Sequence, residues 1–246
     1  MTRIGVVMPA RDEEQALPLV LAELPRARAP VVVVVDNGSR DRTGEVARAG
    51  GATVVREERR GYGQACLTGL AWLLDGAGLV PPLGDEDVVV FLDADHSDYP
   101  EDLERVLAPL LVGQAELVLG SRILGGASRA ALLPQAWFGN RLACFLMRVL
   151  FGARYTDLGP FRAVRVGALR RLAMGDRGFG WTIEMQLKAH SHGLRVVEVP
   201  VRYRARIGKS KITGTLGGTV RAGCRILAWI FAWRLASWRG RHSSGP

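Results

Sequence analysis

Short apolar runs alternate with helical patterns through the first half of the chain. Five consecutive valines, Val31 to Val35, are typical of a strand buried on both faces of a parallel sheet. The pattern predicts strands at Arg3 to Met8, Val31 to Val35, Thr53 to Val55, Asp87 to Leu92 and Glu116 to Leu119. It predicts helices at Glu13 to Leu24, Asp41 to Ala49, Gln64 to Leu74 and Pro100 to Leu111. This alternation indicates an α/β fold, with a doubly wound, mostly parallel sheet and helices on both faces.

Two carboxylates follow the predicted strand at Asp87 to Leu92. Asp93 and Asp95 stand at the edge where open α/β sheets bind ligands. Carboxylates this close repel each other unless a cation lies between them, and their hard oxygens suit Mg²⁺ or Mn²⁺ bridging to substrate phosphates. The alternative is an acidic turn leading into the next helix, and it explains an Asp-x-Asp pattern better when that pattern is taken alone.

The turns after the first three predicted strands are also polar. They are Pro9 to Glu14, Asp36 to Asp41 and Arg59 to Gly63. The carboxyl ends of parallel strands face one way, so these turns should open on the same rim as Asp93. Each has a local alternative, because Asp36 can cap a turn and Gly61 and Gly63 can allow positive φ. Their convergence favours a nucleotide site, with a carboxylate on the base and the Arg60 backbone near phosphate or sugar.

Composition indicates an ordinary globular chain with a basic balance. The 246 residues, 48% of them apolar, can form one large α/β domain or two packed halves. A net charge of +9 favours an anionic partner such as nucleic acid, acidic lipid or a phosphorylated substrate. Three scattered cysteines indicate a reducing compartment, with neither a disulfide framework nor a zinc site. Ile4 to Met8 is too short for a signal peptide, so we expect a cytoplasmic protein.

Two familiar phosphate-binding motifs are incomplete. Gly61 to Cys66 has only the first half of the Gly-x-Gly-x-x-Gly pattern and follows the third predicted strand, not the first. Gly208 to Ser210 imitates the end of a Walker A motif, but Tyr203 stands where the upstream glycine is required. These departures argue against a dinucleotide-binding fold and against a P-loop ATPase.

The assembled motifs resemble the family 2 glycosyltransferases of GT-A fold, particularly the dolichyl- and polyprenyl-phosphate sugar synthases. The matching segments, over roughly residues 4 to 213, are Met8 to Glu14, Val35 to Asp41, Arg60 to Gly63, Asp93 to Asp95, Gly120 to Arg122 and Arg206 to Lys211. Arg11 and Asp12 stand where the family often has Tyr and Asn, and Asn37 where it often has a second Asp. These departures leave the identity of the nucleotide base open.

The resemblance implies a role for each matching residue. The implied donor-binding residues are Pro9, Ala10, Glu13, Asp36, Gly38, Arg60, Gly61, Gly63, Asp93, Ala94, Arg206 and Lys211. Asp93 and Asp95 would hold Mg²⁺ or Mn²⁺. The candidate catalytic residues are Asp95, Arg122, Arg162, Asp157 and Glu184.

The chemistry of the acceptor separates these catalytic candidates. A lipid phosphate is already anionic near neutral pH, so it needs a cation to hold it rather than a strong base, and Arg122 and Arg162 are the candidates. A hydroxyl acceptor would need a carboxylate to take its proton, for which Asp157 and Glu184 are available. Arg162 could instead be a surface residue of a tight turn, and Glu184 could simply favour a helix dipole.

Two segments of the second half have helical spacing and basic residues. Pro134 to Gly152 is predicted to be an amphipathic helix, with packing on the sheet as the alternative. Val220 to Trp238 is rich in Trp, but its longest uncharged run, Ile226 to Trp233, is too short to span a bilayer. We expect this second helix to lie in the headgroup region of a membrane or to form a dimer contact.

These observations combine into one expected organisation and activity. A GT-A domain would span residues 1–213, with a donor half at 1–122 and an acceptor half at 123–213, followed by an amphipathic helix at 214–241 and a disordered tail at 242–246. The expected enzyme moves a hexose from a UDP- or GDP-sugar to a polyprenyl phosphate, peripherally on the inner face of the membrane. The resemblance implies that the reaction inverts the sugar.

Two alternatives to this activity remain. The acceptor could be a small soluble molecule with a phosphate or hydroxyl group, which would make the aromatic helix a homodimer interface. The second alternative is a basic nucleic-acid-binding α/β protein. We expect no nucleic-acid partner, because the acidic pair would repel phosphate without a metal and no recognised nucleic-acid motif is present.

Overall fold

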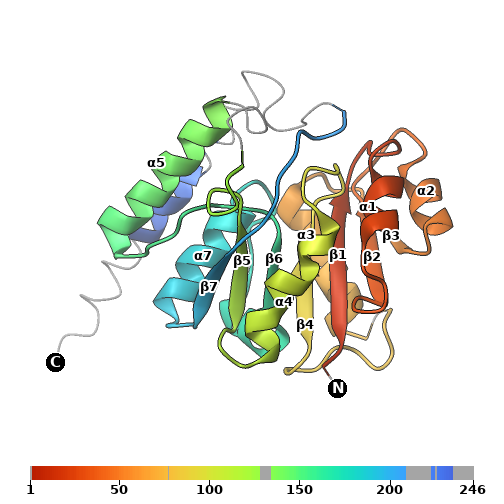
Figure 1. The fold of residues 1–246 in the computed structure, drawn as a ribbon, viewed down its shortest axis with the longest axis horizontal. Helices are drawn as coiled ribbons and strands as arrows, with labels where there is room; N and C mark the ends of the chain where they lie inside the picture. Colours follow the sequence, from red (N-terminus) through yellow and green to blue (C-terminus); the bar gives the residue numbers. More distant parts are fainter. Residues whose placement is uncertain (1, 77, 128–133, 209–222, 225, 235–246) are drawn as a thin grey trace.

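A seven-stranded sheet forms the centre of the computed structural model, which describes residues 2–76, 78–127, 134–208, 223, 224 and 226–234. The strands are β1 Ile4–Ala10, β2 Val31–Asp36, β3 Thr53–Arg56, β4 Val88–Phe91, β5 Leu117–Ser121, β6 Arg162–Arg165 and β7 Val196–Pro200. Their order across the sheet is β3-β2-β1-β4-β6-β5-β7 (Figure 1). Only β6 runs antiparallel to its neighbours, β4 and β5. The predicted mostly parallel α/β sheet is therefore confirmed.

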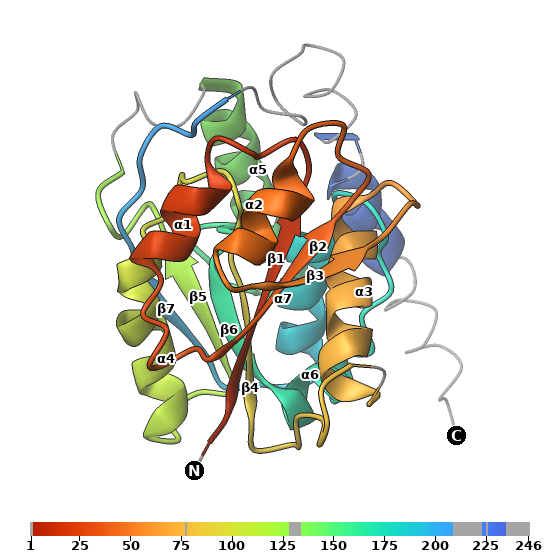
Figure 2. The ribbon, with the colours of Figure 1, turned by 90° about the vertical axis from the view of Figure 1, so that its right-hand side faces the viewer.

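Helices cover both faces of this sheet (Figure 2). They are α1 Leu17–Glu23, α2 Thr43–Ala49, α3 Tyr62–Leu74, α4 Leu103–Leu111, α5 Pro134–Phe151, α6 Val166–Leu172 and α7 Trp181–Ser191, with a 3₁₀ turn at Pro100–Asp102. Along β1, Val6 and Met8 pack with α1 and α4 on one face, whereas Val7 packs with α3 on the other. This alternation buries β1 on both sides and fixes the direction in which its carboxyl end opens.

The first helix is shorter than predicted. It begins at Leu17 rather than Glu13, because side chains of the next loop hold the backbone before it. The amide of Glu13 donates to the hydroxyl of Thr43 at 2.8 Å, and the amide of Glu14 donates to the carboxylate of Asp41 at 3.2 Å. The segment from Ala10 to Ala16 therefore stays at the rim instead of joining the helix.

The predicted helix at Pro134 to Gly152 is confirmed as α5. Its buried residues Ala143 and Met147 pack against Leu187 of α7 and against Ile230. Ile230 belongs to residues 223, 224 and 226–234, which are helical and are called here the C-terminal helix. Figure 1 shows this helix beside α5. The other residues of the predicted helix at 214–241, and the tail at 242–246, lie outside the described residues.

No helix among the residues that the structure describes is long and apolar enough to cross a bilayer.

Candidate active site

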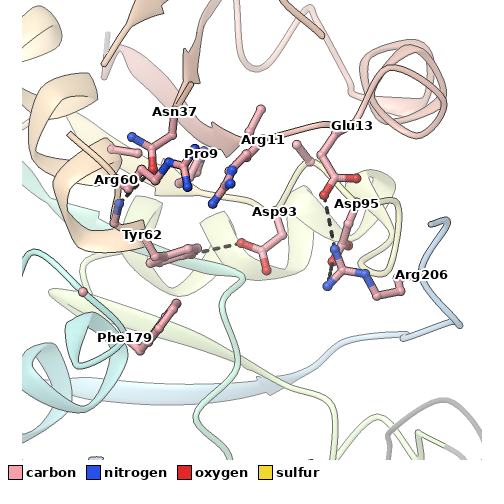
Figure 3. Close-up of a pocket in the computed structure, with 15 residues that line it drawn as sticks. Pro9, Arg11, Glu13, Asn37, Arg60, Tyr62, Asp93, Asp95, Phe179 and Arg206 are labelled. Atoms are coloured by element: carbon pink, nitrogen blue, oxygen red, sulfur yellow. Dashed lines mark hydrogen bonds and ion pairs between the residues drawn. The ribbon is translucent and has the colours of Figure 1, made fainter. Parts of the chain in front are cut away.

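A pocket of about 320 Å³ opens where β1, β2 and β4 end and α3 begins (Figure 3). It is lined by Pro9, Ala10, Arg11, Glu13, Asn37, Arg60, Gly61, Tyr62, Ala65, Asp93, Ala94, Asp95, Gly178, Phe179 and Arg206. Nine of these were predicted to bind the donor or metal: Pro9, Ala10, Glu13, Arg60, Gly61, Asp93, Ala94, Asp95 and Arg206. The parallel strands bring them together from segments almost 200 residues apart in the chain.

The two carboxylates of the Asp-x-Asp pattern have different partners. Asp93 accepts a hydrogen bond from the Tyr62 hydroxyl at 3.0 Å, and Asp95 pairs with the Arg206 guanidinium at 3.0 Å. Arg206 also contacts Glu13 at 3.2 Å, so it bridges two acidic groups across the rim (Figure 3). Burial, and then the neighbouring charge of Asp95, raise the pKa of Asp93 above its ordinary value.

This arrangement fits a divalent cation. Among the described residues, no group of three or more His, Cys, Asp or Glu side chains is placed to enclose a metal. Asp93 and Asp95 would therefore supply two carboxylates, leaving the other coordination positions to water and donor phosphates, as Mg²⁺ and Mn²⁺ commonly require. A cation would also relieve the repulsion between these two neighbouring carboxylates.

Gly61 and Gly63 let a second loop approach the pocket. A Cβ at Gly61 would overlap the carbonyl oxygen of Arg177, and one at Gly63 would overlap that of Asp176. Gly61 also has a φ of +152°, so both its backbone conformation and the close approach of the second loop require a glycine. Gly63 is required only by the close approach. Gly63 does not itself line the pocket.

Asp36 and Gly38 lie beside the pocket rather than in its wall. One oxygen of Asp36 accepts from the amide of Ser39 at 2.9 Å, and Gly38 has a φ of +73°, so both belong to a turn, which was the local alternative for Asp36. Asn37, rather than Asp36, lines the pocket. Its amide nitrogen donates to the carbonyl of Arg59 at 2.8 Å, and its oxygen accepts from the Gly61 amide at 2.9 Å.

Six lining residues were not assigned to the donor site from the sequence: Arg11, Asn37, Tyr62, Ala65, Gly178 and Phe179. Arg11, Asn37 and Tyr62 belong to the polar turns that converge on the rim, and that position was the available signal. Phe179 has no such signal, because it precedes α7 and reaches the pocket only through tertiary packing.

Arg122 and Asp157 form a buried, bidentate ion pair. The guanidinium donates to both oxygens of Asp157, at 2.7 and 2.8 Å, and the backbone amide of Arg122 donates to one of them at 2.8 Å. Burial opposes the charge on Arg122, but Asp157 outweighs it and raises the pKa of Arg122. The guanidinium also lies over the ring of Tyr203, 5.0 Å from its centre.

The sequence offered two arrangements for Arg162, a group that holds the acceptor phosphate and a surface residue of a tight turn, and the structure shows neither. It is neither a surface arginine nor a group on the pocket wall, because it is only 1% exposed. Its guanidinium donates to the carbonyls of Gly159 and Thr182, the latter at 3.2 Å, and burial lowers its pKa to about 10. This placement gives Arg162 no surface on which to hold an acceptor phosphate.

Glu184 lies in the first turn of α7 and is fully engaged. Its two oxygens accept from the amides of Gly175 and Asp176, each at 2.8 Å, and it pairs with Lys188 at 2.8 Å. Glu184 therefore holds the loop before α7 in shape. Lys211 lies outside the described residues.

Comparisons with known proteins identify the family of the chain. The family model described as glycosyl transferase family 2 matches residues 5–172. An undecaprenyl-phosphate mannosyltransferase from Micrococcus luteus is 32% identical over 97% of both chains. A dolichyl-phosphate hexose transferase from Haloferax volcanii is 36% identical over 87% of this chain and 89% of its own.

Solved structures show the same fold. Glucosyl-3-phosphoglycerate synthase from Mycobacterium tuberculosis, bound to Mn²⁺, UDP-glucose and phosphoglyceric acid, is 23% identical, with a TM-score of 0.73 over 95% of this chain and 80% of its own. The chain therefore belongs to glycosyltransferase family 2 and has the GT-A fold.

Proposed function

We propose that the protein transfers a hexose from a UDP- or GDP-sugar to a polyprenyl phosphate, with Mg²⁺ or Mn²⁺ and with inversion at the sugar. The names of the Micrococcus and Haloferax relatives, each aligned over most of this chain, support a polyprenyl or dolichyl phosphate acceptor. The inverting outcome rests on the resemblance to the family.

One observation carries the choice of a phosphate acceptor. Asp157 and Glu184, the two carboxylates that the sequence offered for deprotonating a hydroxyl, are buried, and hydrogen bonds occupy both oxygens of each. Asp98, another buried carboxylate nearby, does not line the pocket. An acceptor that is already anionic needs no general base, so a phosphate fits this site better than a hydroxyl.

The donor diphosphate would lie between the carboxylates and three guanidinium groups. Arg11, Arg60 and Arg206 line the pocket together with Asp93 and Asp95. A divalent cation on the two carboxylates and fixed positive charges around it would stabilise the charge that develops on the leaving diphosphate. Lys211 keeps its predicted role as a further phosphate ligand.

Arg122 is the better placed of the two candidates for the acceptor phosphate. It follows β5 at the end of the sheet that faces the rim, and its side chain is 12% exposed, whereas Arg162 is fully buried. Asp157 and Tyr203 fix the direction of its guanidinium. A prepositioned arginine can hold a phosphate beside the anomeric carbon without first losing side-chain freedom.

The surface of α5 and the charge distribution support binding to an anionic lipid surface. Phe138, Phe145 and Val149 of α5 are 60 to 64% exposed, and Arg141 and Arg148 are exposed between them. Residues 117–156 contain five arginines and no acidic residue, and residues 199–246 contain ten basic residues and no acidic residue. An exposed stripe of aromatic and basic side chains suits the headgroup region of a membrane. A homodimer contact would use the same stripe.

A thermal-shift panel tests the donor half of the proposal. We expect one nucleotide, UDP or GDP, to raise the melting temperature with Mn²⁺ present, because a ligand bound only by the folded state stabilises it. EDTA should remove most of the shift. A shift that is the same with EDTA, or no shift with either nucleotide, would contradict the proposed metal and donor site.

A further inference from the structure

The loop between α6 and α7, residues 173–180, forms one wall of the donor pocket. Gly178 and Phe179 of this pocket loop line the cavity, on the side where Tyr62 lies (Figure 3). The pocket loop also caps α3, because its carbonyls at Gly178 and Arg177 accept from the amides of Gly63 and Gln64, each at 3.0 Å. The start of α3, which carries Tyr62, therefore depends on where the pocket loop lies.

Asp176 holds the pocket loop from within. It is 3% exposed, and one of its oxygens accepts from the amides of Gly178, at 2.7 Å, and Gly180, at 2.9 Å. These bonds flank Phe179 on both sides. The direction in which the Asp176 carboxylate points therefore sets the position of Phe179.

The other oxygen of Asp176 joins the pocket loop to the C-terminal helix. The indole nitrogen of Trp229 donates to it at 2.6 Å. The indole also packs directly on Gly180, where a Cβ would overlap it. The helix that carries Trp229 is itself seated on α5 and α7 through Ile226 and Ile230. One hydrogen bond thus connects an element outside the sheet to the wall of the donor pocket.

We propose that Trp229 and Asp176 are positioning residues for the donor, through which seating of the C-terminal helix sets the shape of the pocket loop. The inference rests on the proposed function, in that the pocket must hold the nucleotide sugar. Coupling of this kind is reciprocal, so donor binding would also favour the seated helix. The same helix packs on the buried face of α5, so α5 connects its exposed stripe, and a lipid surface bound there, to the helix that carries Trp229.

Kinetics of matched variants test the proposal. Trp229→Phe keeps an aromatic ring but removes the N–H donor, and we expect it to raise the KM for the nucleotide sugar about three- to tenfold while kcat stays within twofold. The control is Phe231→Leu, two residues along the same helix, where the ring is 55% exposed. It should leave KM unchanged. Equal effects of the two variants would overturn the proposal.

A double-mutant cycle identifies the partner. Asp176→Asn keeps one oxygen for the loop amides but removes the charge that Trp229 contacts, so it should also raise KM. The double variant should be no worse than the stronger single variant, because both changes break the same bond. Additive effects would mean that the two residues act separately, and would overturn the proposal.

Hydrogen exchange separates failure of this inference from failure of the proposed function. We expect amides of residues 173–180 to exchange faster in Trp229→Phe than in the native chain or in Phe231→Leu, whether or not a nucleotide binds. Unchanged exchange in the pocket loop would overturn the inference. If exchange rises but the native chain binds neither UDP nor GDP, the coupling stands and the proposed donor is wrong.

Discussion

The two carboxylates at the end of β4 place opposite demands on folding and on function. Asp93 is held close to Asp95 in a partly enclosed pocket, where Tyr62 and Arg206 offset the repulsion only in part. The same repulsion is what attracts a divalent cation. A change that relieves it should therefore help the fold and harm the reaction.

Asp93→Asn tests this conflict. The amide keeps an oxygen for the Tyr62 hydroxyl but removes one charge, so we expect a melting temperature without metal at or above that of the native chain. Sugar transfer should fall at least about 100-fold, because a metal ligand is weakened. Transfer within a few-fold of the native rate would show that Asp93 does not hold the metal.

Glu57 makes the wall behind the donor pocket sensitive to acid. Arg59, followed by Thr68 and Gln64, donates hydrogen bonds to its carboxylate and lowers the pKa of Glu57 from 4.5 to about 2. A carboxyl with a lowered folded-state pKa adds stability that is present above pH 4.5 and is lost as the pH falls toward 2.

Glu57→Gln should remove this contribution. We expect about 1–2 kcal/mol less unfolding free energy at pH 7, and a smaller loss of stability than in the native chain between pH 4.5 and pH 3. Urea unfolding at pH 7, pH 4.5 and pH 3 measures both the loss of unfolding free energy at pH 7 and its dependence on pH. Parallel pH profiles for the two proteins would contradict the assignment.

The glycine turn at the start of α3 depends on close contact with the backbone of the pocket loop. Gly63→Ala would place a Cβ inside the carbonyl of Asp176, so we expect about 2–4 kcal/mol of destabilisation. Gly139→Ala on the exposed side of α5 is the matched control, since a Cβ there meets no described heavy atom within 4 Å. It should stabilise α5 by about 0.5–1 kcal/mol. Similar losses in both variants would contradict the role of the close contact.

The strands and the rim could be predicted because local patterns determine them. The valine run of β2 and the apolar run of β4 each indicate a buried strand, and parallel topology then places the following turns on one edge. β6 could not be predicted, because only four residues form it and its place between β4 and β5 depends on tertiary pairing.

The position of the pocket loop also could not be predicted from sequence patterns. Its shape depends on Asp176 meeting Trp229, 53 residues later in the chain. The burial of Arg162 had the same kind of cause, since the carbonyls that hold it belong to Gly159 and to Thr182 of α7. Contacts of this kind leave no local signature in hydrophobic spacing.

For the whole molecule, charge separates the two halves. Residues 1–116 contain twenty acidic and eleven basic residues, whereas the chain from residue 117 onward contains four acidic and twenty-two basic residues. An anionic surface would therefore attract the second half and repel the first, which would orient α5 toward the lipid.

Arg148→Glu on α5 tests this orientation. We expect it to weaken binding to vesicles of anionic lipid about tenfold in a sedimentation assay at low salt, and to leave the nucleotide-dependent thermal shift unchanged. Arg48→Glu on α2 is the control and should bind vesicles like the native chain. Equal weakening in both variants would indicate attraction through net charge alone, and a native chain that sediments with no vesicles would favour the homodimer.

A transfer assay with three acceptors identifies the acceptor of the enzyme. Incorporation of labelled hexose from a nucleotide sugar should be compared for polyprenyl phosphate, the matching polyprenol and 3-phosphoglycerate, each with Mn²⁺. We expect transfer to polyprenyl phosphate alone, because Asp157 and Glu184 have no free oxygen with which to activate a hydroxyl. Transfer to the polyprenol at a comparable rate, or to the soluble phosphate but not to the lipid, would contradict a polyprenyl phosphate acceptor.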